Sequence, residues 1–144
     1  MIEQDTVKLL RECDAGVKMG VSSIGDVLPY VKAKDLEALL LSSKREHERL
    51  GDEIEKMLND YQDEGKEPNP IAKGMSWFKV KMEMFASETD AKVANLMTDG
   101  CNMGVKSLNR YLNQYEAAEE RVKDIAKKLI ALEERLTADI RDYL

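Results

Sequence analysis

This sequence of 144 residues is poor in the residues that build sheets and loops. It has eight glycines, three prolines, two phenylalanines, one tryptophan and one histidine. Few residues therefore favour β-strands. Alanine, leucine, glutamate, lysine and methionine are plentiful by contrast, and their side chains lose little freedom in a helix. The composition predicts an all-α protein, and the length fits one domain over residues 1–144.

Cysteine is scarce as well. Cys13 and Cys101 are too few for a disulfide framework and do not form a Cys-x-x-Cys pair. We expect both thiols to be reduced and buried, packing as small hydrophobic groups.

Long apolar runs are missing too. No run approaches the roughly 20 residues that span a bilayer, and the first residues lack a basic region followed by an apolar stretch. We therefore expect a cytoplasmic protein with no membrane span. The net charge of -6 and the pI near 5.0 disfavour nucleic acid and anionic membranes as partners, because both would repel the chain.

What the sequence does contain is helical periodicity. Apolar residues recur in heptads over residues 5–31, with Asp5 or Thr6 as the N-cap, and a second amphipathic stretch covers residues 34–63. The short connection between them predicts an antiparallel hairpin over residues 4–63.

A break with two prolines and one glycine follows, "DEGKEPNP". Ser87 resembles an N-cap, and further helices are expected to reach residue 115 and to cover 117–144, which gives a second hairpin over 88–144. The intervening crossover, residues 64–87, is long enough to run the length of a bundle and contains a short amphipathic helix.

The two hairpins resemble each other. Gly16 and Gly20 recur 84 residues later as Gly100 and Gly104, and the second helices match at an offset of 86. We predict pseudo-two-fold symmetry, with helices in up-down-down-up order. Each interior glycine costs about 1 kcal/mol relative to alanine. Helices one and three are therefore expected to pack closely at these glycines. Otherwise the glycines make room for a bulky neighbour such as Met19, Met103 or Tyr111, or open a small pocket in the core.

Several polar residues interrupt the predicted core near the middle of the bundle. Asp14 is expected to face inward or to lie at the edge of the core, and Ser43 and His47 interrupt the apolar row of the second helix. Glu133 is the counterpart of His47 under the repeat. Thr98 is the counterpart of Asp14, and Asp99 is its neighbour. A buried charge is costly unless it is paired or coordinated, so we expect a polar layer.

This duplicated hairpin with a long crossover resembles the ferritin-like superfamily of four-helix bundles, and more loosely a small uncharacterised bacterial branch of it. Di-iron members carry one Glu on two helices and Glu-x-x-His on the other two. Here Lys44 and Ile130 stand three residues before His47 and Glu133, so neither Glu-x-x-His is present. The resemblance implies a set of metal ligands that match the family by their height along the bundle and not by motif: Asp14, His47, Asp99 and Glu133.

Three interpretations of these polar residues follow. Asp14 and His47 form a buried hydrogen-bonded pair; His47 and carboxylates bind one iron, manganese or zinc ion; or Ser43, His47 and Asp14 form a catalytic triad, for which no oxyanion donors are visible. We expect a non-catalytic structural or protein-interaction module with no cofactor. The alternative is an atypical metal-binding or redox protein.

The crossover carries an apolar stripe that includes Phe78, while Trp77 and Met84 fall outside it. Exposed aromatic and methionine side chains favour an interface. We predict a homodimer contact through Trp77, Phe78 and Met84. Packing within the chain, or binding of a membrane surface or a foreign partner through the nearby lysines, are the alternatives.

Overall fold

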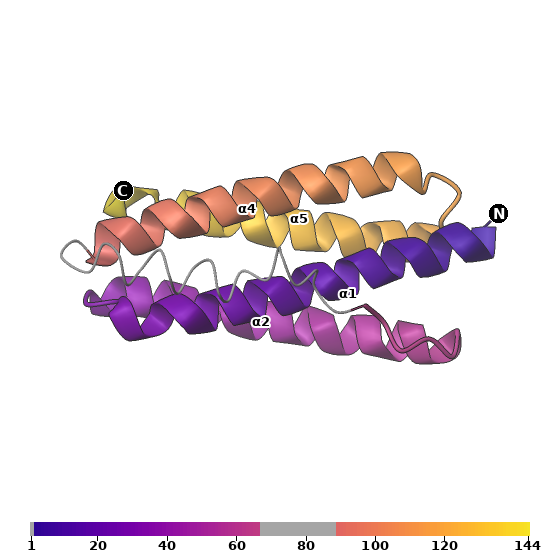
Figure 1. Cartoon of the computed structure of the whole chain (residues 1–144), viewed down its shortest axis with the longest axis horizontal. Helices are drawn as coiled ribbons and strands as arrows, with labels where there is room; N and C mark the ends of the chain where they lie inside the picture. Colours follow the sequence, from indigo (N-terminus) through magenta and orange to yellow (C-terminus); the bar gives the residue numbers. More distant parts are fainter. Residues whose placement is uncertain (1, 67–88) are drawn as a thin grey trace.

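The computed structural model describes residues 2–66 and 89–144. Four long helices lie side by side along one axis (Figure 1). They are α1 (Ile2–Val27), α2 (Lys34–Asp60), α4 (Thr89–Gln114) and α5 (Glu120–Ile140). Short 3₁₀ turns follow α1 and α5, at Leu28–Tyr30 and Arg141–Tyr143. The prediction of an all-α four-helix bundle with a long crossover after its second helix is confirmed.

The helix ends differ from the expected ones. The prediction of Asp5 or Thr6 as the first N-cap is wrong, because α1 begins at Ile2 and both residues lie inside it. The first helix was predicted to reach residue 31, but α1 ends at Val27 because Pro29 has no N–H and disfavours helix at the residue before it. α2 ends three residues early, where Gln62 adopts a positive φ of 55°. The predicted N-cap Ser87 lies outside the described residues.

Side chains at the start of one hairpin hold the turn of the other. The hydroxyl of Thr6 accepts the N–H of Glu119, the N-cap residue of α5, at 2.9 Å. The carboxylate of Asp90, in the first turn of α4, accepts the N–H of Ala33, the N-cap residue of α2, at 3.0 Å. Asp90 also accepts the N–H of Lys32 at 2.7 Å.

These contacts fix the helix directions. α1 and α5 begin at the same end of the bundle, and α2 and α4 begin at the other, so α2 and α4 run the same way (Figure 1). The two contacts also correspond: Thr6 and Asp90 are 84 residues apart, and Ala33 and Glu119 are 86 apart. These are the offsets of the sequence repeat, so each hairpin caps its twin in the same way.

The core consists of two apolar clusters with polar residues between them. One cluster lies around Leu10, Ile54 and Leu129, and the other around Ile24, Leu40 and Ile140. His47 and Glu133 fall in the gap on their helices, between the last residues of one cluster and the first of the other. The described residues include no helix that is long and apolar enough to cross a membrane.

Candidate functional site

His47 lies in the centre of the bundle with only 1% of its surface exposed. Its Nδ1 is 2.8 Å from the carbonyl oxygen of Ser43, one turn earlier on α2. A carbonyl can only accept, so Nδ1 carries the proton that is donated there. The hydroxyl of Ser43 lies 3.5 Å from the same nitrogen. Nε2 is therefore the free ring position, and it has no hydrogen-bond partner among the described residues.

Glu133 faces this free nitrogen from α5. The residue is 7% exposed, and its Oε1 lies 3.9 Å from His47 Nε2. Its other oxygen, Oε2, is buried and has no hydrogen-bond partner in the described part of the chain. Burial raises the pKa of Glu133 and the nearby His47 acts in the opposite direction. The pair thus joins the two hairpins through one titratable contact.

Glycines of the same hairpins contact both side chains. A Cβ atom at Gly20 would lie 2.6 Å from His47 Cδ2, and one at Gly104 would overlap the Glu133 carboxylate. Gly20 and Gly104 are 84 residues apart, whereas His47 and Glu133 are 86 apart. The same arrangement, a glycine beneath a long polar side chain, therefore occurs once in each hairpin.

These contacts change the role predicted for the glycines. We expected them to bring the first and third long helices together. α1 and α4 do pack against each other, but Gly20 receives a side chain from α2, and Gly16 and Gly104 face Leu129 and Glu133 of α5. Gly100 is half-buried. Side chains of neighbouring helices fill the space left by the missing Cβ atoms. The glycines therefore make room for bulky neighbours, which was the alternative prediction, but these neighbours are not Met19, Met103 or Tyr111.

The expected hydrogen-bonded pair of Asp14 and His47 is wrong, because His47 Nδ1 contacts the Ser43 carbonyl and Nε2 has no hydrogen-bond partner among the described residues. Asp14 is 7% exposed, and its Oδ2 accepts the backbone N–H of Lys66 at 2.9 Å and pairs with Lys18 Nζ at 2.9 Å. Gly65, with a φ of 85°, packs directly against this carboxylate. Asp14 precedes Gly20 by six residues, which is about 9 Å of helix. Asp14 thus ties the chain that follows α2 to α1.

The predicted four-residue metal set is therefore only half assembled. The structure brings His47 and Glu133 together, Asp14 contacts the chain after α2, and Asp99 is exposed on α4. In the described ranges, no three His, Cys, Asp or Glu side chains are grouped closely enough to hold a metal ion. In the proposed triad, Ser43 is near His47, but the Nδ1 that Asp14 would orient already donates to a carbonyl.

The two thiols are buried as predicted. Cys13 and Cys101 are free, and each is at most 4% exposed. Burial raises the pKa of both thiols to about 12, which leaves almost no thiolate at neutral pH. They pack as apolar groups.

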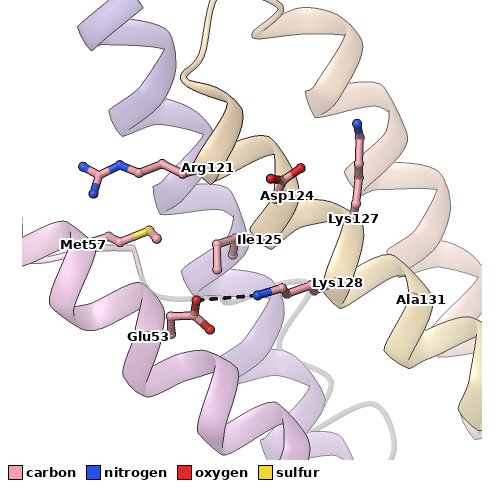
Figure 2. Close-up of a pocket in the computed structure, with 8 residues that line it drawn as sticks. All are labelled: Glu53, Met57, Arg121, Asp124, Ile125, Lys127, Lys128 and Ala131. Atoms are coloured by element: carbon pink, nitrogen blue, oxygen red, sulfur yellow. Dashed lines mark ion pairs between the residues drawn. The ribbon is translucent and has the colours of Figure 1, made fainter.

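Two grooves run along the seam between α2 and α5. The larger, about 510 Å³, has Met57 and Ile125 among its lining residues, and the Lys128 ammonium and Glu53 carboxylate point toward one another across it at 3.7 Å (Figure 2). The smaller, about 280 Å³, is lined by Ser43, the residue that binds His47 Nδ1, and by the ion pair of Glu46 and Arg135. Sequence patterns had not indicated either groove.

The predicted interface residues Trp77, Phe78 and Met84 lie outside the described residues, so their role stays a prediction. No family model matches the chain, and neither the curated proteins nor the solved structures include a match. The ferritin-like resemblance therefore stays at the level of a four-helix bundle with a long crossover.

Proposed function

We propose that this chain is a non-catalytic structural or protein-interaction module with a ferritin-like layout, in which a buried polar layer fixes how the two hairpins dock. One observation carries the proposal: each hairpin presents one polar side chain over one of its own glycines, and these two side chains, His47 and Glu133, meet between α2 and α5. A structural role suits groups that are 1% and 7% exposed, because a solute cannot reach them without opening the bundle.

The pair makes the docking of the two hairpins specific. The Glu133 carboxylate lies 3.9 Å from His47 Nε2, and a shifted register of the hairpins would lose this electrostatic contact while both groups stayed buried, which is costly. The pair therefore selects one alignment of the two hairpins.

The unpartnered atoms favour one alternative function. Nε2 of His47 and Oε2 of Glu133 are both ligand atoms, both are buried, and both lack a hydrogen bond within the described residues. Imidazole and carboxylate together suit iron, manganese or zinc. Two protein ligands alone make an incomplete site, so in this alternative solvent or a further side chain completes the coordination of an atypical metal-binding or redox centre.

Elemental analysis separates the two functions. Purified protein is analysed before and after loading with iron, manganese and zinc, beside His47→Ala and the exposed control Glu134→Gln. The structural proposal expects no stoichiometric metal and a loss of stability only in His47→Ala. Stoichiometric metal that disappears in His47→Ala and persists in Glu134→Gln would overturn it in favour of the metal centre.

We also propose that the chain forms a homodimer in the cytoplasm, with Trp77, Phe78 and Met84 at an interface. Sedimentation of Trp77→Ser is expected to show a shift toward monomer. An unchanged mass would count against these three residues as an interface.

A further inference from the structure

The outer face of α4 differs from the outer faces of α2 and α5. Six exposed residues, spaced alternately by four and three, form one stripe on the side of α4 that points away from the core. They are Asn95, Asp99, Asn102, Lys106, Asn109 and Asn113. Exposed positions on α2 and α5 carry mostly lysine, arginine, glutamate and aspartate. α4, which lies along one edge of the bundle (Figure 1), instead presents a row of amides to solvent.

Asparagine is a poor choice for such positions if solvation is their only purpose. It is among the weaker helix formers because its amide competes for backbone hydrogen bonds. Asn109 does so here, donating to the carbonyl of Val105 at 3.0 Å. A surface that departs from local helix preference without a packing reason is typical of a functional surface.

An exposed methionine lies beside the stripe. Met103 is 66% exposed and lies one turn from both Asp99 and Lys106. In the described part of the chain, the other large hydrophobic residues this exposed are Ile2 and Leu144, which lie at its two ends. Methionine is enriched at protein interfaces, where its flexible side chain adapts to the partner.

The face is complementary to itself. A two-fold axis that crosses α4 between Asn102 and Met103 has Asp99 and Lys106 at equal distances on either side. Each copy's Asp99 then lies opposite Lys106 of the other copy. Within the described residues, neither side chain makes an ion pair in its own chain.

We propose that the outer face of α4 is a self-association surface, on which a second copy of this chain docks antiparallel about that axis. The inference rests on the proposed function as an interaction module and adds a surface to it. Charge complementarity selects a second copy as the occupant, because the one acidic and one basic residue of the stripe are matched by the symmetry itself. A contact one helix wide and largely polar is at the small end of interfaces, so the dimer is expected to be weak and dependent on concentration.

Paired charge reversals test the symmetry directly. Asp99→Lys places two positive charges on each face, and Lys106→Asp places two negative charges there. Each variant alone is expected to self-associate at least about tenfold more weakly than the wild type in a sedimentation-velocity concentration series, because both ion pairs become repulsive. An equimolar mixture of the two variants restores both pairs, and so recovers the dimer. The double variant Asp99→Lys/Lys106→Asp recovers it as well.

Glu48→Lys, an exposed charge reversal on α2, is the matched control and is expected to leave self-association unchanged. Circular dichroism checks that every variant is folded. A wild-type dimer that neither reversal weakens overturns the α4 surface and leaves the proposed module intact; its loss in Trp77→Ser would then locate the contact on the crossover. A wild type that stays monomeric at every concentration overturns self-association, whereas the docking role of His47 and Glu133 is judged separately by metal content and stability.

Discussion

The imidazole of His47 lies against Gly20 so closely that a methyl group on the glycine would be 2.6 Å from the ring. Real Cβ atoms do not come this near another heavy atom, so one of the two must move. The ring has little freedom, because its Nδ1 is held by the Ser43 carbonyl and its surface is 1% exposed.

Gly20→Ala is therefore expected to destabilise the protein by about 1–2 kcal/mol, although alanine is the better helix former. Gly25 on the same helix is the matched control, since a Cβ built there meets no atom of the described residues within 4 Å beyond its chain neighbours and the backbone of its own helix. Gly25→Ala is expected to be neutral or to stabilise by up to about 1 kcal/mol. Urea unfolding of both variants measures the difference. Equal effects of the same sign would show that the ring adapts freely.

The second prediction concerns the pH dependence of stability. Burial raises the pKa of Glu133 above its ordinary value of 4.5. Between that value and the raised pKa, the folded protein binds more protons than the unfolded chain. The contribution of Glu133 to the free energy of unfolding is thus full below pH 4.5 and is lost as the pH rises through the raised pKa.

Glu133→Gln removes this titration and keeps the shape of the side chain. The stability of the variant relative to wild type is expected to increase as the pH rises from 4.5 through the raised pKa of Glu133. Urea unfolding in a series of buffers measures this change. Glu134→Gln, at an exposed neighbouring position, supplies the control and should follow the wild-type curve. A constant difference between Glu133→Gln and wild type at all pH values would contradict a raised pKa.

The third prediction concerns the contacts by which Thr6 and Asp90 each accept an N–H group from the turn of the opposite hairpin. Thr6→Ala and Asp90→Ala each leave N–H groups of the opposite hairpin's turn without their acceptor. Each is expected to cost about 0.5–2 kcal/mol, with Asp90→Ala the larger because its charged carboxylate accepts two N–H groups. The sites are at opposite ends of the bundle, so the double variant should be additive within about 0.5 kcal/mol. Thermal or urea unfolding measures all three, with the exposed Lys8→Ala as reference.

The fourth prediction concerns the contact between Asp14 and the chain after α2. Asp14→Ala removes the acceptor of the Lys66 N–H, so hydrogen exchange of that amide is expected to become faster. Gly65→Ala should have the same effect, because the position has a positive φ and no room for a side chain. Asp99→Ala, at an exposed position on α4, should leave the Lys66 amide unchanged. Protection that survives in Asp14→Ala would show that another group holds this segment.

The rotation of a helix between adjacent residues explains why the sequence pattern placed only some of the polar residues correctly. A helix turns by about 100° per residue, so Thr98 can be half-buried while the adjacent Asp99 points to solvent. Periodicity assigned His47 and Glu133 correctly to the interior, because each replaces a leucine-like position in a long apolar row. Asp14 also lies inside, but its partner comes from residue 66, beyond the end of a helix, where periodicity gives no guidance.

The sequence by itself determined the number of long helices, the two hairpins and their repeat, because heptad periodicity, the break after residue 63 and the offset of 84 residues are all local or internal to the chain. Only the tertiary structure decided what each glycine and each polar group touches. Those contacts depend on how far neighbouring helices are rotated and shifted against each other, and packing across the whole bundle sets these two quantities. Gly20 and Gly104 are the plainest case: the pattern identified both, and only the packing assigned His47 and Glu133 as their neighbours.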